Sequence, residues 1–220
     1  MTKLSKLNIN EIERNGQWND IDPEITGIET NSTRVEKGNI FLAKAGATKN
    51  SHGVLFSNQA IERGASLVIT DPEGFKFALD KDLKPTIPFL LVRNLESTFD
   101  YLCQIFYPDK PKFVMGVTGT NGKTSVVNFS QQLIEKKNNS CVTIGTLGVG
   151  GVLSLRTDNT TPDQSFIARI LQMAKLKGTN YALLEVSSHS IVQKRIKNLA
   201  FNVSALLIYL KITWIIIKIW

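Results

Sequence analysis

The sequence has little cysteine and little histidine, and it contains no long run of charge of one sign. Two of its 220 residues are cysteine and two are histidine. Cys103 and Cys141 stand in unrelated apolar segments, so we expect buried free thiols in a reducing compartment, not a disulfide framework or a zinc site. The net charge is +7, but no run of like charges is longer than the pair Lys136-Lys137. Such scattered charge does not predict nucleic-acid binding, whereas a nucleotide or sugar-phosphate ligand would suit it.

Long apolar segments are also scarce. The residues that follow Met1–Leu7 are not an apolar core, which argues against a signal peptide. With 42% hydrophobic and 20% charged residues, the composition is ordinary for a soluble globular protein. We therefore expect a cytoplasmic monomer that does not use a membrane. The exception is the apolar stretch 203–220, which is considered at the end of this subsection.

The first hundred residues predict a small α/β domain. Short apolar runs bounded by turn residues predict strands at 40–43, 67–70 and 89–92, and helical spacing predicts helices at 54–63 and 95–106. Pro108 and Pro111 then interrupt the pattern. We place a domain boundary there, with one domain over 1–108 and a second over 109–206.

The second domain begins with strand, glycine loop and helix. Phe113–Val117 is a continuous apolar run, as expected for a buried parallel strand. The helix after the loop is expected to bury a face marked by Val126, Phe129, Leu133 and Ile134. Further strands are predicted at 141–144 and 182–186, and Thr161 with Pro162 is expected to begin another helix. The fold class is therefore α/β with a mainly parallel sheet in the second domain.

The glycine loop carries the strongest chemical signal. Glycines let backbone N–H groups approach phosphate oxygens, and the following helix adds its positive N-terminal end. Lys123 would place a point charge on the β- and γ-phosphates, and the Thr124 hydroxyl would ligate Mg²⁺. The expected ATP-binding residues are Gly119, Thr120, Asn121, Gly122, Lys123, Thr124 and Ser125.

The spacing of the glycines indicates which family of phosphate-loop proteins the sequence resembles. The general phosphate loop has glycine where this sequence has Val117, and the glycines stand instead at 116, 119 and 122. With Gly-Thr-Asn-Gly-Lys-Thr intact, the segment resembles the loop of Mur ligases and of their relative folylpolyglutamate synthase. In both, ATP phosphorylates a carboxylate, and an amine then attacks the acyl phosphate.

Later segments resemble the Mur ligases that act on UDP-N-acetylmuramoyl-L-alanyl-D-glutamate. The segments are Asn-Thr-Thr-Pro at 159–162, Glu-Val-Ser-Ser-His at 185–189 and Gln-Lys-Arg at 193–195. The resemblance implies substrate-binding roles for Asn159, Thr160, Thr161, Ser187, Gln193 and Arg195. Taken singly, Thr161 could be only a helix cap, and Arg195 only a solvated residue on a basic helix at 194–197. Their order and spacing together favour the functional interpretation.

A carboxylate at the end of a parallel strand is a typical metal ligand in open α/β sheets. Glu185 occupies that position, and the resemblance implies that it helps to bind Mg²⁺ beside Thr124. His189 follows by four residues and could assist with metal or phosphate, or be structural. The expected catalytic residues are therefore Lys123, Glu185 and His189.

The first domain resembles the uridine-binding domain of the same family. The family pattern Asp-Ser-Arg stands here as Ser32-Thr33-Arg34, so Thr33 keeps the hydroxyl expected to contact uracil, whereas Ser32 lacks the carboxylate. The loop 47–49 is expected to complete that pocket. The resemblance covers roughly residues 25 to 205.

The resemblance implies an ATP- and Mg²⁺-dependent ligase that joins a diamino acid, diaminopimelate or lysine, to UDP-MurNAc-L-Ala-D-Glu. Two alternatives stay open. A folylpolyglutamate synthase is disfavoured by the uridine-type domain and by Gln193 with Arg195. A non-catalytic nucleotide-binding protein built from ligase parts is the other alternative.

We interpret residues 207–220 as an out-of-frame tail and not a membrane anchor, because Lys211 falls within the apolar stretch. One set of permitted codons for this tail, read in a shifted frame, spells Asn-Leu-Ser-Gln-Asp-His-Leu-Asp-Tyr-His, which resembles the family's continuation. A chain that ended so would be expected to lack ligase activity. Sequencing the gene tests the interpretation: the alternative frame beyond codon 206 should encode Asp-His-Leu-Asp and a ligase remainder, and without them the anchor interpretation reopens.

Overall fold

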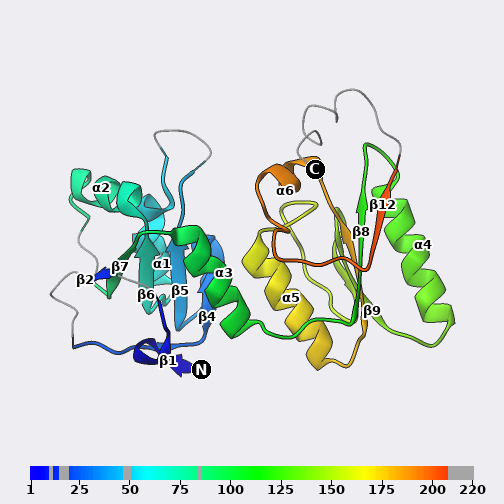
Figure 1. The fold of residues 1–220 in the computed structure, drawn as a ribbon, viewed down its shortest axis with the longest axis horizontal. Coiled ribbons are helices and arrows are strands. Elements are labelled where there is room, and N and C mark those ends of the chain that lie inside the picture. Colours follow the sequence, from blue (N-terminus) through cyan, green and yellow to red (C-terminus); the bar gives the residue numbers. More distant parts are fainter. Residues whose placement is uncertain (10–11, 15–19, 47–50, 84–85, 208–220) are drawn as a thin grey trace. The chain divides into compact units, whose positions relative to one another are not determined.

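The computed structural model describes residues 1–9, 12–14, 20–46, 51–83 and 86–207. The chain forms two compact units, Met1–Phe106 and Tyr107–Trp220. Each unit contains a five-stranded, mainly parallel sheet with helices packed on it (Figure 1). The α/β fold predicted from the sequence is therefore confirmed, and the division lies just before Pro108.

The sheet of the first unit has strand order β2-β7-β6-β5-β4. Neighbouring strands from β4 to β7 are parallel, and β2 is antiparallel to β7. The strands are β2 (Ile12–Arg14), β4 (Gly27–Glu29), β5 (Asn39–Ala43), β6 (Leu67–Thr70) and β7 (Phe89–Val92); β1 (Thr2–Lys3) pairs separately with β3 (Glu24–Ile25). The three strands predicted here from apolar runs are present as β5, β6 and β7.

The helices of the first unit are α1 (Ser57–Glu62), α2 (Pro72–Asp80) and α3 (Leu95–Phe106), with 3₁₀ turns η1 (Leu4–Lys6), η3 (Ser32–Arg34) and η4 (Gly53–Phe56). The helix predicted over 54–63 is therefore divided into η4 and α1. His52 Nδ1 accepts the Val54 N–H at 3.1 Å, and the Gly53 N–H donates to Lys44 O at 2.7 Å. These bonds fasten the first turn to the segment after β5, so the α-helix begins later.

The sheet of the second unit has strand order β10-β9-β11-β8-β12. All neighbours are parallel except β10, which is antiparallel to β9. The strands are β8 (Phe113–Thr118), β9 (Cys141–Gly145), β10 (Gly148–Gly151), β11 (Tyr181–Glu185) and β12 (Val203–Leu206). The carboxyl ends of β8, β9 and β11 therefore meet at one edge, where ligands bind in sheets of this kind.

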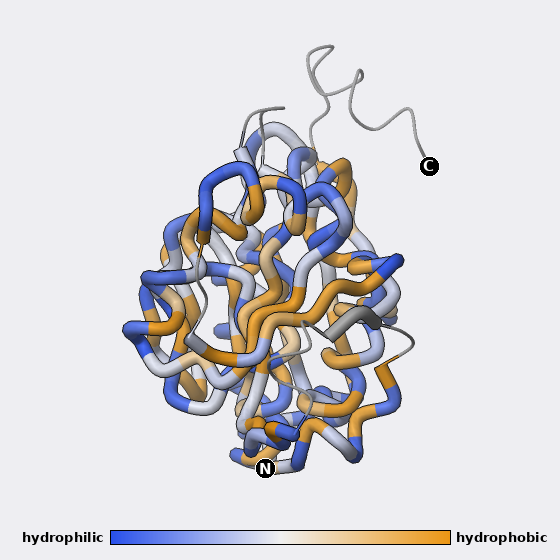
Figure 2. The backbone as a smooth tube through the Cα atoms, turned by 90° about the vertical axis from the view of Figure 1, so that its left-hand side faces the viewer, coloured by the Kyte–Doolittle hydropathy of each residue, from blue (hydrophilic) through white to orange (hydrophobic). Residues whose placement is uncertain are grey.

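Helices α4 (Lys123–Lys136) and α5 (Gln164–Leu176) cover opposite faces of this sheet, and α6 (Ser188–Val192) follows β11 (Figure 1). Strand side chains alternate between the two faces, so Ala182 and Leu184 pack on the α5 side and Leu183 on the α4 side. In Figure 2, where the first unit faces the viewer, the strands of its sheet appear as hydrophobic stretches and the surrounding segments as alternating hydrophobic and hydrophilic residues. Cys103 and Cys141 are buried free thiols, and burial, with a smaller effect of Glu135, raises the pKa of Cys141 to about 11.

The predicted buried face of α4 is partly wrong. Phe129 and Leu133 are 62% and 65% exposed, whereas Val127 is 3% exposed and Ile134 packs against the sheet. The buried stripe is centred on Val127 and Ile134, which stand seven residues apart on one side of the helix. Phe129 and Leu133 are large and apolar, which is why the sequence suggests that they are buried, but they lie beside the buried stripe and not in it.

The predicted start of α5 is also wrong. Its N-cap is Asp163, whose side chain accepts the Phe166 N–H at 3.1 Å. Thr161 cannot cap the helix because its hydroxyl is bound to Glu185 O and the Ser187 N–H. The basic helix expected at 194–197 is instead a series of turns, in which Lys194 has a positive φ of 54°.

Within the described ranges, no helix is long and apolar enough to cross a membrane. The predicted out-of-frame tail lies outside the described residues except for Leu207. The loop 47–49 expected at the uridine pocket lies outside them as well.

Gly116 in β8 provides a test of the packing. A Cβ atom there would lie 2.8 Å from the Phe201 ring, closer than real contacts allow. We expect Gly116→Ala to lower the free energy of unfolding by about 1–3 kcal/mol, because overpacking forces the ring to move. Urea denaturation measures the loss, and it should shrink in a Phe201→Leu background. An equal loss in both backgrounds would contradict the assigned contact.

Candidate active site

The phosphate loop connects β8 to α4 with the backbone that its glycines allow. Gly119 and Gly122 have φ angles of 137° and 86°, in the region that favours glycine. Gly122 is the N-cap of α4, and the helix begins at Lys123. The first N–H groups of a helix have no partner within it, so this end can receive an anion.

Lys123 lies against this loop. Its Nζ donates to Gly119 O at 2.8 Å and to Thr120 O at 3.4 Å. These carbonyls hold the ammonium beside the loop at the start of α4. The arrangement agrees with the predicted role of Lys123 as a cation for phosphate, since a phosphate oxygen can replace a carbonyl as its hydrogen-bond partner.

Glu185 is the centre of the polar network. It ends β11, is only 2% exposed, and accepts hydrogen bonds from two threonines. Thr124 Oγ1 donates to Oε2 at 2.9 Å; the Thr146 N–H donates to Oε1 at 3.0 Å, and Thr146 Oγ1 to Oε2 at 3.1 Å. The structure thus brings together the two predicted metal ligands, Thr124 from the first turn of α4 and Glu185 from the end of β11.

Gly145 makes the approach of Glu185 possible. A Cβ atom at this position would lie 2.2 Å from Glu185 Oε1, where no side chain fits. Glycine at the end of β9 therefore leaves the space in which the carboxylate reaches the Thr146 N–H.

The two predicted substrate threonines have different roles in the structure. Thr160 Oγ1 lies 3.1 Å from Thr146 Oγ1, at the margin of the Glu185 network. Thr161 is 1% exposed; its hydroxyl donates to Glu185 O at 2.8 Å and accepts the Ser187 N–H at 2.9 Å. Thr161 therefore fixes the segment after β11 to the loop before α5, and its hydroxyl is engaged within the protein.

The other predicted substrate residues follow β11. Ser187 is the N-cap of α6, and Arg195 donates to Thr161 O at 2.5 Å. Asn159, Gln193 and His189 are exposed. The Glu185 carboxylate is bound by threonines and not by His189, so the structure gives no support to an assisting role for this histidine.

The donor set fits a hard divalent cation such as Mg²⁺, because hydroxyl and carboxylate oxygens are the ligands that it prefers. Among the residues that the structure describes, no group of three or more His, Cys, Asp or Glu could hold a metal.

The first unit contains a separate cavity of about 510 Å³ at the carboxyl ends of β4 and β5. Hydroxyl and amide side chains line part of it, among them Asn31, Ser32, Thr33, Ser51 and Gln59, and the rings of Phe41 and Phe56 add apolar surface. Asn31 Oδ1 accepts both the Thr33 N–H at 3.0 Å and Thr33 Oγ1 at 2.8 Å. Ser32 donates to Gln59 Oε1 at 2.6 Å. Gln59 thus supplies a polar partner to Ser32, which stands where the resembled family has aspartate.

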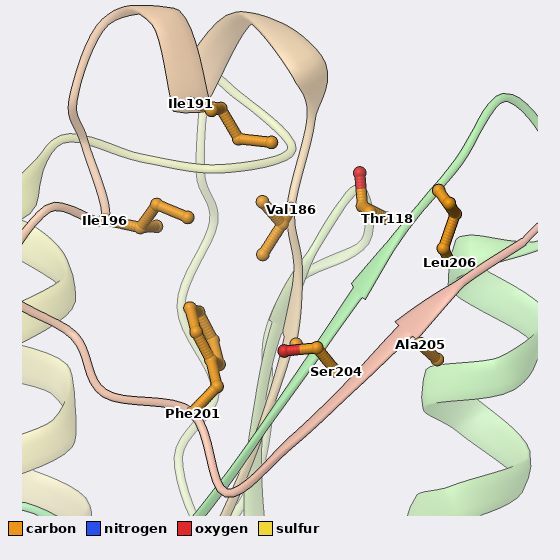
Figure 3. A pocket seen from close by; sticks show the side chains of 9 residues that line it. Thr118, Val186, Ile191, Ile196, Phe201, Ser204, Ala205 and Leu206 are labelled. Carbon is orange, nitrogen blue, oxygen red and sulfur yellow. The ribbon is translucent and has the colours of Figure 1, made fainter. Parts of the chain in front are cut away.

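An apolar groove of about 280 Å³ lies beside the start of the phosphate loop (Figure 3). Thr118 and Leu206 lie on one side of it and Ile191, Ile196 and Phe201 on the other, with Val186 between them. The edge strand β12 exposes apolar side chains here, with Leu206 60% exposed. Leu207 packs near the loop, where its N–H donates to Thr118 O at 2.9 Å.

Two protein-family models match this chain. The Mur ligase middle domain matches residues 117–208, and the Mur ligase family, catalytic domain, matches residues 24–98. The chain belongs to the Mur ligase family. The resemblance found in its phosphate loop and in Ser32-Thr33-Arg34 is thereby confirmed.

Relatives in this family include the UDP-N-acetylmuramoyl-L-alanyl-D-glutamate–2,6-diaminopimelate ligase of Phocaeicola vulgatus. It is 33% identical over 202 residues, which are 90% of this chain and 40% of that protein. The ligase of the same name from Rickettsia rickettsii is 33% identical over 185 residues, 82% of this chain and 36% of that protein. The chain thus spans well under half the length of these relatives.

A solved structure of a UDP-N-acetylmuramoyl-L-alanyl-D-glutamate–2,6-diaminopimelate ligase matches with a TM-score of 0.61 and 25% identity, over 83% of this chain and 36% of that one. The MurF ligase of Thermotoga maritima in complex with ADP matches with a TM-score of 0.52 and 20% identity, over 83% of this chain and 37% of that one. At 20% identity, the match to the MurF structure shows that the fold is shared and carries no information about function.

Sequence reasoning missed Thr146, Asn31 and Gln59. Thr146 directly follows a predicted strand, so its place at the carboxyl end of a parallel strand was the available signal. Asn31 stands two residues before Thr33, the spacing at which an Asn side chain bonds a backbone N–H. Gln59 lies far from Ser32 in sequence, and no local signal connects them.

Lys123→Ala tests the phosphate loop. Loss of a charge-assisted hydrogen bond to phosphate should weaken ATP binding by roughly 1.5–3 kcal/mol. Calorimetry on folded protein measures the affinity, and Lys136→Ala, in the last turn of the same helix, should leave it unchanged. Equal affinities of the Lys123 variant and the unaltered protein would contradict the role.

Proposed function

We propose that this chain supplies the uridine-nucleotide-binding and ATP-binding parts of a ligase that joins a diamino acid to UDP-MurNAc-L-Ala-D-Glu. The Glu185 network is the observation that carries the proposal, because it brings the phosphate loop and the predicted substrate segments to one sheet edge. The names of the relatives support the same reaction, and they favour diaminopimelate as the added amino acid.

The reaction takes place in two steps. A carboxylate oxygen of D-glutamate attacks the γ-phosphorus of ATP, the bond to the bridging oxygen breaks, and ADP leaves with an acyl phosphate formed. The amine of the diamino acid then attacks the acyl carbon, phosphate leaves, and an amide results after the nitrogen loses a proton. The chain's part in the first step is to position and stabilise charge on the phosphoryl group.

Each residue of the site has a role in that step. The N–H groups at the start of α4 and the Lys123 ammonium hold phosphate oxygens. Thr124 and Glu185 would hold Mg²⁺, which would supply positive charge to the phosphoryl oxygens. Thr160 faces the acceptor substrate, while Thr161, Ser187 and Arg195 fix the loop that presents it.

The cavity of the first unit would bind the uridine end of the substrate. The hydroxyl and amide groups among its lining residues suit a nucleoside, whose base and ribose present both donors and acceptors, and Phe41 and Phe56 offer apolar surface to a base. Thr33 is exposed at this cavity, and its hydroxyl shares Asn31 Oδ1 with a backbone N–H.

Binding of uridine nucleotides tests this assignment. We expect UDP to bind the full chain, and Thr33→Val to weaken binding by about 0.5–1.5 kcal/mol, the value of one neutral hydrogen bond. Thr33→Ser keeps the hydroxyl and should bind as the unaltered protein does. Calorimetry with UDP and with UDP-MurNAc-L-Ala-D-Glu measures both. If folded protein binds neither ligand, the proposal fails.

A further inference from the structure

Thr146 belongs to two hydrogen-bonded groups at once. Its N–H and its hydroxyl both contact the Glu185 carboxylate, and its hydroxyl oxygen also lies 3.1 Å from Thr160 Oγ1. Glu185 faces the phosphate loop through Thr124, whereas Thr160 belongs to the segment assigned to the acceptor substrate. Thr146 therefore connects the carboxylate on the nucleotide side to the Thr160 hydroxyl on the acceptor side of the site, whereas Thr161 contacts only the Glu185 backbone oxygen.

The direction of these hydrogen bonds follows from the available protons. A carboxylate only accepts, so the Thr146 hydroxyl gives its single proton to Glu185. Thr160 must then donate in the bond between the two threonines. Thr160 thus has no proton left for a ligand and presents lone pairs alone. Its ligand should be an N–H or O–H group, such as a peptide amide or a sugar hydroxyl, and not a carboxylate or phosphate.

The same reasoning applies at the nucleotide side. Thr124 also gives its proton to Glu185, so its oxygen lone pairs are free to face a cation. The three hydrogen bonds occupy three of about four acceptor positions on the carboxylate. About one position is left for a direct metal bond, and its orientation depends on the Thr146 contacts.

We propose that Thr146 is a positioning residue that couples acceptor-substrate binding at Thr160 to nucleotide and metal binding at Glu185. A ligand donor on Thr160 fixes the rotamers of Thr160 and Thr146, and the Thr146 contacts in turn fix the orientation of the Glu185 carboxylate, so a second ligand meets a network that is already ordered. Binding of either substrate thereby orders the network for the other. This inference rests on the proposed function, because it takes the ligand near Thr160 to be the UDP-MurNAc-dipeptide.

Calorimetry on the full chain tests the coupling. The affinity for Mg²⁺–ADP is measured without and with saturating UDP-MurNAc-L-Ala-D-Glu. For the unaltered protein we expect the second ligand to tighten nucleotide binding at least about fivefold, the lower end of usual allosteric coupling. Thr146→Val keeps the shape and the N–H but removes the hydroxyl, and should reduce the factor to below about twofold. Thr146→Ser should retain it.

Thr157→Val is the matched control, because the Thr157 hydroxyl lies nearby but reaches only Gly145 O, at 3.4 Å. Its coupling should equal that of the unaltered protein. Should Thr146→Val fail to fold, Thr160→Val breaks the same bond from the other end and should also abolish the coupling while Mg²⁺–ADP still binds alone.

The outcomes separate the two proposals. If unaltered protein binds neither ligand, the proposed function fails and the inference with it. If it binds both without coupling, or if Thr146→Val or Thr160→Val preserves the full coupling, the inference about Thr146 is overturned while the proposed function stands.

Discussion

The second unit depends on a carboxylate buried at the end of a parallel strand. Glu185 is 2% exposed, and burial of a carboxylate without hydrogen-bond partners would be strongly unfavourable. Three donors satisfy it, one from Thr124 in the first turn of α4 and two from Thr146 after β9, so both segments are tied to β11. The phosphate loop, its helix and the threonine segment therefore have one common reference point.

This arrangement requires glycine, which has no side chain, at two positions. Gly145 leaves the space that Glu185 Oε1 fills, and Gly122 gives the turn that starts α4 at Lys123. A methyl group at Gly145 would displace the Glu185 carboxylate and break its hydrogen bonds with Thr124 and Thr146. The glycines therefore determine the position of the acid as well as the shape of the loop.

The strands were predictable from the sequence wherever a continuous apolar run marked them. Continuous apolar runs predicted β5, β6, β7, β8, β9 and β11, because strands buried on both faces need them. Strand β10 was not predicted, because three of its four residues are the glycines Gly148, Gly150 and Gly151, and glycine has a low propensity for strands. The sequence predicts the wrong buried face for α4, because Phe129 and Leu133 are large and apolar. Which side of the helix is buried depends on how α4 packs on the sheet, and the local sequence does not determine that.

For the site, motif residues were predictable but their hydrogen-bond partners were not. Glu185 and Thr124 were expected as a pair, and the structure joins them at 2.9 Å. Thr161 was expected as a cap or a substrate contact, yet its hydroxyl is bound to Glu185 O and the Ser187 N–H, bonds over 24 and 26 residues of sequence. Partners at such separations depend on the sheet order β9-β11-β8, which places the three loops together.

Hydroxyl groups, not extra charges, surround the acid in this site, and their chemistry explains why. A lysine or arginine beside Glu185 would neutralise it and compete with a cation for its oxygens. Threonine satisfies the carboxylate with one proton and keeps its own lone pairs for a further ligand. The network can therefore stay closed within the protein and still offer acceptors outward, at Thr124 and Thr160, to the metal and the substrate that we propose. A buried acid held in this way remains available for chemistry that a salt bridge would suppress.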